Sequence, residues 1–458
     1  MSVNNTSTGR NDSFKFNLIP KEVPKINSKY RKIVTSIPPE NSIPILNELK
    51  KYEPESMSLE LPVVWDKAED FQIFDESGNC WIDFSSGTFV TNAGHRHPKI
   101  CKAIIDTVEN NYLHNYYFPS KIRAKLVKKL HDMTPQNLDK VFLLTTGAEA
   151  TECSIKLARI FGRKSNPKKI GIVSFVGAMH GKTLGALMVG GKEKEKHWVV
   201  NHDPDMYHLP FPDSSSTKET FLKDLKNLEK KCVDLSTICA FMVESYQGWG
   251  ALFYPKEYVQ ALRTWASEND VIVIFDEIQS GFGRTGKLFA YEHYNVEADI
   301  VCCGKGISSG LPLSAVLGRK ELIDADPSLN STHGGNPVCS AATLASLEIL
   351  ESENLIEESA RKGKLIEKEL QKIKAKFPNK IQFSGKGMVF AIHVKNTSDS
   401  GLDVEIVDKI IEKSMQKGVL LIRTGTGTIK IGPPLTIPDD ALIEGLSVIE
   451  ESISELFH

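Results

Sequence analysis

The sequence predicts an α/β protein with a large domain, built on a mostly parallel central sheet, and a smaller α+β lobe. Short apolar runs such as residues 238–243 and 300–303 alternate with helical stretches such as 256–268. Continuous apolar runs bounded by helices indicate strands covered on both faces, which is typical of parallel sheets. After Pro337 the pattern changes to long helices and short strands, which predicts the second lobe.

The large domain is predicted from the middle of the chain, where strand-like and helical stretches alternate. Its strands are expected at residues 140–144, 170–175, 238–243, 271–275 and 300–303, with helices at 148–161 and 256–268. The later part predicts a long helical region at 341–376, strands at 381–383 and 388–394, a helix at 404–417, a hairpin at 419–431 and a last helix from Asp439. Residues 63–83 predict a small hairpin, because Gly78 and Asn79 in its turn tolerate a positive φ.

These patterns give four expected segments. Residues 1–62 form an N-terminal arm, the first 35 or so partly disordered, and 63–90 form the N-terminal part of the small lobe. Residues 91–340 form the large domain, which holds the ligand, and 341–458 the C-terminal small domain. A chain of 458 residues is expected to have two to three domains, or to be one large two-lobed enzyme.

The composition excludes several classes of protein. With 41% hydrophobic and 25% charged residues the chain can bury a large core, which excludes global disorder, collagen and coiled coil. The net charge of −2 argues against avid nucleic-acid binding. We find no apolar run long enough for a transmembrane helix and no signal-peptide core, so no membrane association is expected.

Two local features bear on compartment and metal content. Residues 1–35 carry seven Lys and Arg against two acids, which predicts a solvated lead-in rather than a transit peptide. The eight cysteines include no CxxC, so we expect free thiols in a reducing, cytoplasmic environment. No metal is expected, because the tightest histidine pair, His95 and His97, has no Cys or HExxH companion.

The strongest chemical signal is an acid and a lysine that each follow an apolar strand. Asp276 and Glu277 end one run, where α/β folds bind ligands, and an ionised acid buried there needs a cationic partner. Lys305 lies between Gly304 and Gly306 after the next run, and a desolvated lysine is an amine nucleophile suited to Schiff-base chemistry. The alternative is that Asp276 caps a helix and Lys305 is a surface lysine, which the pairing makes less favoured.

An anion site is predicted beside them. Thr146 is a good N-cap, and Glu149 completes a capping-box pattern. Gly147 and Ala148 then offer free amides at a helix N-terminus, which suits a phosphate. The segment at 177–183 resembles a P-loop but is one residue too short, and no GxGxxG follows a strand, so nucleotide binding of either type is not favoured.

Taken together, these residues resemble the class III aminotransferases, the ω-aminotransferase group that includes 4-aminobutyrate and ornithine aminotransferases. The resemblance covers roughly residues 60–458. It rests on SGTFVTNAGHRHP (86–98), TTGAEA (145–150), GAMHGKT (177–183), VESYQG (243–248), FDEIQSGFGRTG (275–286), DIVCCGKG (299–306), THGGNP (332–337) and GPPLTI (432–437). It implies the fold type I of pyridoxal-phosphate-dependent transferases, with pyridoxal 5′-phosphate as the cofactor.

The resemblance also implies a role for each matching residue. Lys305 and Asp276 are the expected catalytic residues: the lysine holds the cofactor as a Schiff base, and the aspartate pairs with the ring nitrogen. The further cofactor residues it implies are Gly147 and Ala148 for the phosphate, Gln279 for the phenolic oxygen, Ile278 and Met179 for the two ring faces, His180, Glu244, and Thr332 for the phosphate of a neighbouring subunit. The partners expected are therefore a small-molecule amino donor, a 2-oxo acid acceptor and a second copy of the chain, with ping-pong transfer of the amino group.

Departures from the family pattern concern the substrate. Met179 stands where an aromatic residue usually stacks on the ring, and a thioether holds it more loosely. The arginine–glutamate switch of the 4-aminobutyrate branch is missing, because Lys182, Trp249 and Lys430 occupy its positions, and lysine cannot form a bidentate fork. Arg423 is expected either to supply a carboxylate clamp or to be solvated.

Thr88 and Phe89 are expected at the pocket entrance, by their place in the SGTFVTN segment. The alternative to an aminotransferase is an amino-acid racemase or epimerase on the same scaffold, which a looser ring environment at Met179 would permit. A non-enzymatic descendant would have lost Lys305 or Asp276, and both are present.

Overall fold

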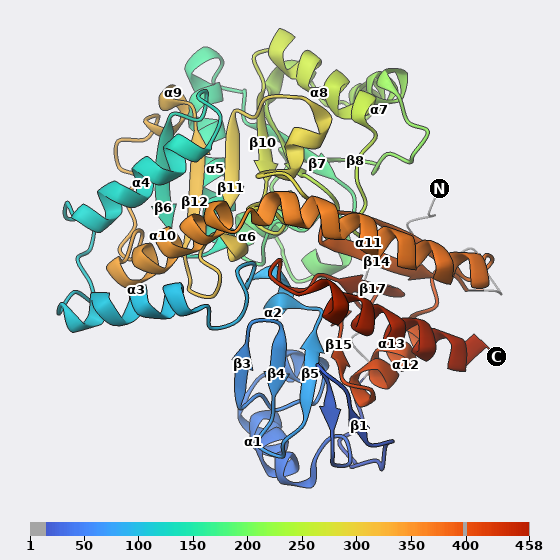
Figure 1. Cartoon of the computed structure of the whole chain (residues 1–458). Helices are drawn as coiled ribbons and strands as arrows, with labels where there is room; N and C mark the ends of the chain where they lie inside the picture. Colours follow the sequence, from blue (N-terminus) through green and yellow to red (C-terminus); the bar gives the residue numbers. More distant parts are fainter. Residues whose placement is uncertain (1–14, 397–400, 458) are drawn as a thin grey trace. The chain divides into compact units, whose positions relative to one another are not determined.

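The computed structural model describes residues 15–396 and 401–457, and the chain folds into two compact units (Figure 1). The first unit comprises Pro98–Gly248 and Leu252–Ile356. The second comprises the described residues up to His97, the short segment Trp249–Ala251, and the chain from Glu357 onward. Of the first 35 or so residues, for which partial disorder was predicted, residues 1–14 lie outside the described residues, and the rest include the short strands β1 (Ile26–Asn27) and β2 (Lys32–Ile33).

A seven-stranded sheet forms the centre of the first unit. Its strands, in spatial order, are β6 (Lys140–Leu144), β12 (Ser314–Gly318), β11 (Ile300–Cys303), β10 (Ile272–Asp276), β9 (Ile238–Glu244), β7 (Gly171–Phe175) and β8 (Met206–Leu209). The pairs from β11 to β8 are parallel, while β12 is antiparallel to both of its neighbours. The predicted mostly parallel α/β sheet is therefore confirmed.

Helices surround this sheet. They are α3 (Pro98–Glu109), α4 (Lys121–Met133), α5 (Gly147–Ser165), α6 (Leu184–Val189), α7 (Lys218–Lys230), α8 (Lys256–Glu268), α9 (Lys320–Ile323) and α10 (Pro337–Ser352). The bounds predicted for β6, β11 and α8 agree with the structure. Among the described residues, none of the helices combines the length and apolar character that crossing a bilayer requires.

The long helical region predicted at 341–376 is in fact two helices. The first is α10, and the second, α11, spans Leu355–Lys376. The helix breaks at Asn354, which takes a φ of +49° that a continuous right-handed helix cannot accommodate. The change of unit follows directly, at Ile356.

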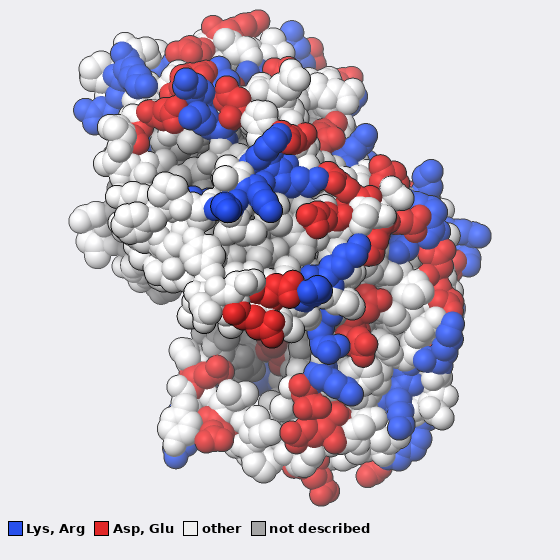
Figure 2. Space-filling view, turned by 60° about the vertical axis from the view of Figure 1, so that its left-hand side comes forward, with Lys and Arg blue, Asp and Glu red and all other residues white. Residues whose placement is uncertain are grey.

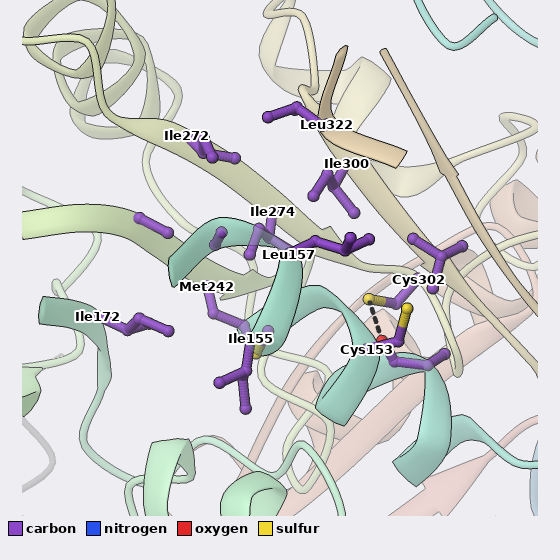
Figure 3. Packing of buried hydrophobic residues seen from close by; sticks show 14 of the residues in the cluster. Cys153, Ile155, Leu157, Ile172, Met242, Ile272, Ile274, Ile300, Cys302 and Leu322 are labelled. Carbon is purple, nitrogen blue, oxygen red and sulfur yellow. Dashed lines mark hydrogen bonds between the residues drawn. The ribbon is translucent and has the colours of Figure 1, made fainter. Parts of the chain in front are cut away.

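One hydrophobic core of the first unit lies between α5 and the sheet (Figure 3). Leu157 and Cys153 of α5 belong to one buried cluster with Ile272 and Ile274 of β10 and with Cys302 of β11. The Cys302 Sγ is hydrogen-bonded to Ser154 Oγ at 3.0 Å. Side chains alternate along a strand, so the residue two positions beyond Ile274 shares its face. The last residue of β10 is therefore directed to the α5 side of the sheet.

The second unit contains two further sheets. One has the order β1 (Ile26–Asn27), β2 (Lys32–Ile33), β5 (Cys80–Asp83), β4 (Gln72–Phe74) and β3 (Lys67–Glu69), with β15 (Val419–Leu420) pairing to β5. The other, all antiparallel, has the order β13 (Ile381–Lys386), β14 (Val389–Val394), β17 (Thr428–Ile431) and β16 (Ile422–Arg423). Its helices are α1 (Ile43–Tyr52), the four-residue α2 (Ser86–Phe89), α12 (Val404–Gln416) and α13 (Asp439–Phe457), with most of α11.

Two predicted hairpins can be compared with these sheets. The hairpin at 63–83 is present as β4 and β5, and Gly78 in its turn has a φ of +86°. The hairpin at 419–431 is only partly correct. Strands β16 and β17 form it, whereas β15 pairs in parallel with β5 of the other sheet.

The basic lead-in is mostly exposed where the structure describes it, as predicted, but it is also anchored to the rest of its unit. Phe16 and Ile33 are buried, Lys29 Nζ lies 2.6 Å from Asp440, and Arg31 Nε lies 2.6 Å from Glu444. The positive arm therefore binds the acidic helix α13 at the other end of the chain. On the face shown in Figure 2, basic and acidic side chains are likewise interspersed, with no broad field of one sign.

Candidate active site

Two adjacent parallel strands bring Asp276 and Lys305 to one end of the sheet. Asp276 is the last residue of β10 and is paired in register with Cys302 of β11, and Lys305 follows three residues later. Asp276 is buried, at 7% exposure, and shares the α5 face with Ile272 and Ile274. The sequence prediction that both residues follow strand ends is confirmed by this geometry.

His180 is the partner of Asp276. Its Nδ1 lies 2.7 Å from Asp276 Oδ2, and the other carboxylate oxygen accepts the Ile278 N–H at 3.1 Å. The ring is fixed from its own backbone as well, because Thr151 Oγ1 donates to the His180 carbonyl at 2.8 Å. An ionised Asp276 requires the proton on Nδ1 to be donated to it. The carboxylate is thus held in one orientation by two donors.

Lys305 lies in an environment that favours the neutral amine. Burial lowers the pKa of Lys305 below its usual value, and the negative charges of Asp276 and Glu244 act in the opposite direction. The backbone of Lys305 has a φ of +44°, a left-handed conformation that costs a non-glycine residue free energy and that clusters at functional sites. A buried amine with a lowered pKa is a competent nucleophile.

Glu277, next to Asp276, is held on the other side of the strand end. Its carboxyl group accepts hydrogen bonds from the Ser245 and Ser280 hydroxyls and from the N–H groups of Ala290 and Tyr291. The side chain is fully buried, and burial raises the pKa of Glu277 to about 7. Glu277 is therefore bound into the fold, and of the two adjacent acids Asp276 is the one near Lys305.

The predicted anion site lies at the start of α5. The Thr146 hydroxyl accepts the Glu149 N–H at 3.3 Å, and Glu149 Oε2 accepts the Thr146 N–H at 2.7 Å, so the predicted capping box is confirmed. This leaves Gly147 and Ala148 in the first turn of a 19-residue helix, with the positive end of its dipole.

Ile278 joins this helix start to the lysine loop. A Cβ placed on Gly147 would lie 2.9 Å from the Ile278 side chain, and one on Gly304 would lie 3.1 Å from it. The two glycines are therefore required for the close approach of the segment after β10, the segment after β11 and α5. The prediction that Ile278 lies among the cofactor residues agrees with this position.

The loop that carries Met179 and His180 is held by a second acid. Glu244, the last residue of β9 and the register partner of Asp276, accepts the Met179 N–H and the Gly248 N–H, each at 3.1 Å. A Cβ on Gly248 would lie 2.9 Å from a carboxylate oxygen of Glu244 and 3.2 Å from the carboxamide oxygen of Gln279. Glu244 and Gln279 thus both lie beside the same glycine. Met179 itself is 37% exposed.

Two further predicted residues of this unit lie at its surface. Lys182 is exposed in the loop before α6, and Thr332 is exposed in the loop before α10. The next residue, His333, packs its ring against His114 with centroids 5.1 Å apart.

Five predicted substrate residues belong to the second unit, and two of them lie in a strained turn. Ser86, Gly87, Thr88 and Phe89 all have positive φ, between 50° and 66°. Three non-glycine residues in this conformation cost roughly 1–2 kcal/mol each. Thr88 is exposed, whereas Phe89 is buried with Lys430 Nζ 4.3 Å from its ring centroid, a cation–π distance.

Arg423 does not lie open for a carboxylate clamp, and it is not solvated either. Its Nε and Nη2 donate to the two oxygens of Asp408 at 2.6 and 3.0 Å, and the side chains of this pair are 0% and 1% exposed. A guanidinium already neutralised by a bidentate acid is a poor substrate ligand. Trp249, half-buried, packs edge-on against His393 with ring centroids 6.3 Å apart.

Some contacts of the site could not be read from the sequence. The bonds of His180 to Asp276, and of Thr151 to the His180 backbone, join residues 96 and 29 positions apart. Capping and strand-end patterns are local, so they do not report such pairs.

The residues of the first unit fit an aldehyde cofactor that carries a phosphate and a basic ring nitrogen. A buried amine, an oriented carboxylate and a helix N-terminus meet there, and the buried His180 Nε2 has no hydrogen-bond partner among the described residues. Across the same residues, no group of three or more His, Cys, Asp or Glu side chains could hold a metal ion.

Comparison with known proteins agrees with this chemistry. Residues 54–453 match the family described as "Aminotransferase class-III". A 2-aminoadipate transaminase of Pseudomonas putida is 34% identical over 416 residues, covering 88% of this chain and 98% of the relative. An alanine/serine racemase of Pyrococcus horikoshii is 30% identical over 462 residues, covering 96% of each.

The fold is also shared with solved structures. The ornithine aminotransferase of Toxoplasma gondii superposes with a TM-score of 0.81 at 25% identity, covering 92% of this chain and 96% of that one. The fold is therefore the fold type I of pyridoxal-phosphate-dependent transferases, as expected. With the family match spanning most of its length, the chain belongs to the class III aminotransferases, enzymes that use pyridoxal phosphate to transfer an amino group from a donor to a 2-oxo acid.

Proposed function

We propose that Lys305 is the covalent anchor of pyridoxal phosphate and the group that moves the proton in the transfer. The observation that carries this is the position of Lys305, whose amine has a lowered pKa, near Asp276 at the ends of neighbouring strands. When bound, the cofactor supplies an electron sink that makes a C–H bond of the amino donor acidic. Lys305 Nζ, once displaced by the donor, accepts that proton as a base and returns it as an acid.

Asp276 and α5 are proposed to orient the cofactor. The Asp276 carboxylate, held by His180 and the Ile278 N–H, would face the ring nitrogen and keep it protonated. Such a charge-assisted hydrogen bond contributes roughly 1.5–3 kcal/mol. The N–H groups of Gly147 and Ala148 would bind the phosphate.

Three further side chains would complete the cofactor site. Gln279 would contact the phenolic oxygen, while Ile278 and Met179 would contact the ring. The support for this set is that Gln279, Ile278 and the Met179 loop all lie beside the glycines and acids described above.

A donor-only reaction tests the transferase assignment. Purified protein that carries the cofactor is mixed with candidate amino donors and no acceptor. We expect stoichiometric conversion to pyridoxamine phosphate with release of one carbonyl product. A protein that converts the donor to a mixture of its two enantiomers with exchanged α-hydrogen, and forms no pyridoxamine phosphate, is a racemase instead.

Racemisation is retained as the second candidate because of two observations. The Pyrococcus horikoshii relative is named an alanine/serine racemase, and Met179 stands where an aromatic ring is expected in the family pattern. A looser contact with the cofactor face would permit proton return from either side. The donor-only reaction separates the two activities.

The substrate is proposed to be an amine or amino-acid donor, with a 2-oxo acid as acceptor. Lys430 is retained as a contact for a carboxylate, with Thr88, Phe89, Trp249 and Lys182, whereas Arg423 is removed because Asp408 occupies it. Lys430→Ala should raise the apparent KM for a carboxylate-bearing partner. An unchanged KM removes Lys430 from the set.

We further propose a homodimer that forms through α3 and the loop after it. Ile105, Val108, Leu113, Tyr117 and Phe118 are all between 49% and 69% exposed. Five large apolar side chains exposed within one segment, 105–118, favour a protein interface. This loop adjoins the Thr332 segment, since Asn336 Nδ2 donates to the Leu113 carbonyl at 3.0 Å, and this supports the proposal that Thr332 reaches a partner's phosphate. Light scattering should give twice the mass of the chain, and Phe118→Glu should lower it.

A cytoplasmic location is proposed from the cysteines. All eight are free thiols in the structure, as suits a reducing compartment. Imaging of the tagged full chain in its own cell would test this.

A further inference from the structure

Two acids at neighbouring strand ends hold two successive residues of one loop. Asp276 binds the His180 side chain, and Glu244 binds the Met179 backbone N–H. Because Glu244 and Asp276 are register partners on β9 and β10, their carboxyl groups emerge side by side. The loop is therefore fixed at two consecutive points by two different strands.

Glu244 has no other evident task in the fold. Its two oxygens accept backbone N–H groups of Met179 and Gly248, and the residue is 8% exposed. A buried carboxyl group is costly, and a backbone turn can be closed without one. The free-energy cost of burying Glu244 is explained if its charge, or its hydrogen bond to the Met179 N–H, serves the reaction.

We propose that Glu244 is a positioning residue for the transfer reaction: it holds Met179 against the cofactor face, and it places a carboxylate beside Asp276 at the same end of the sheet as Lys305. This inference rests on the proposed function, because it takes Met179 and Lys305 as cofactor contacts. It extends that function by assigning to Glu244 an action through Met179 and Lys305 rather than contact with the cofactor.

The charges around Glu244 support the second part. Burial raises the pKa of Glu244 to about 7, the charge of Asp276 raises it further and the charge of His180 lowers it. The titratable groups that face it are His180, Asp276, Lys305, Tyr246 and Tyr254. Glu244 therefore changes its charge near neutral pH, and the negative form stabilises a proton on the nitrogen of Lys305.

The test compares Glu244→Gln with Glu152→Gln in protein that carries the cofactor. Glu152 is a matched control, since it also accepts a backbone N–H, that of Ala186 at 3.0 Å, in the same unit. The absorbance of the bound cofactor is recorded from pH 5 to 9. We expect the midpoint at which the lysine–cofactor linkage takes up a proton to fall by about one pH unit in Glu244→Gln. The midpoint of Glu152→Gln should stay at that of the unaltered protein.

A second variant separates the effect of the Glu244 charge from the effect of its hydrogen bonds to the Met179 and Gly248 N–H groups. Glu244→Asp keeps the charge but is too short to reach both N–H groups, so it should retain the midpoint and release the cofactor on dialysis roughly tenfold faster. An unchanged midpoint in Glu244→Gln, or release from Glu244→Asp at the unaltered rate, overturns the inference. A wild-type chain that shows no titrating cofactor band contradicts the proposed function instead.

Discussion

Each unit of the molecule buries a pair of an aspartate and a basic side chain, and the two pairs are completed differently. In the second unit, both oxygens of Asp408 are bound by the permanently charged Arg423. In the first, Asp276 is bound by a backbone N–H and by His180, whose other nitrogen is buried with no hydrogen-bond partner among the described residues. Both oxygens of Asp408 are thus bound by one permanently charged group, whereas Asp276 is held by a backbone N–H and a titratable ring, an arrangement that is common at functional sites.

The largest expected effect is a loss of catalysis when Asp276, the aspartate of the first pair, is substituted. Asp276→Asn keeps the shape but removes the charge that faces the ring nitrogen, so kcat should fall on the order of 10²–10³-fold. The melting temperature should change little. Steady-state kinetics on cofactor-loaded protein measure the first, and thermal unfolding measures the second. A fall in stability with kcat intact would make Asp276 structural.

The same substitution at Asp408 should lower the stability of the fold and leave catalysis almost unchanged. Asp408→Asn leaves the buried guanidinium of Arg423 without its anion, which should destabilise the fold by roughly 3–5 kcal/mol. The kcat of the folded fraction should remain near that of the unaltered protein. Denaturant unfolding followed by activity at low temperature gives both values, and a stable but inactive Asp408→Asn would return this pair to the site.

His180 should show an intermediate effect. His180→Gln removes the donor that orients Asp276, and the loss of one hydrogen bond to a charged group corresponds to about a tenfold to hundredfold fall in kcat. The cofactor should still bind, because Lys305 and α5 are unchanged. Activity equal to that of the unaltered protein would show that Asp276 needs no second side chain.

The smallest expected effect is on the pH dependence of stability, through His393 of the second unit. Burial lowers the pKa of His393 from 6.5 to about 4, and Ser384 and Thr428 hydrogen-bond its two ring nitrogens. The unfolded chain therefore takes up a proton before the folded chain does, so stability should fall as the pH is lowered from about 6.5 to about 4. His393→Asn should show a shallower fall over this range in denaturant titrations. An equal slope would mean that other groups dominate the acid response.

The sequence was informative where a signal is local. Asp276 and Lys305 each follow an apolar run, and the capping box at Thr146 is a three-residue pattern, so all three could be predicted. The pairing of Asp408 with Arg423 could not, because neither the helix nor the strand that carries them marks which face meets the other.

Two other features of the structure could not be predicted from local sequence patterns. The turn at 86–89 contains only one glycine, yet all four residues take a positive φ, which no composition rule predicts. The anchoring of the basic arm could not be predicted, because its partner acids, Asp440 and Glu444, lie more than 400 residues further along the chain.

The central claim is that Lys305 carries the cofactor. Protein loaded with pyridoxal phosphate is reduced with borohydride, which makes the linkage permanent, then digested and analysed by mass spectrometry. We expect one cofactor-labelled peptide, with the label on Lys305, and no label in Lys305→Ala. A label on another lysine, or none in the unaltered protein, would contradict it.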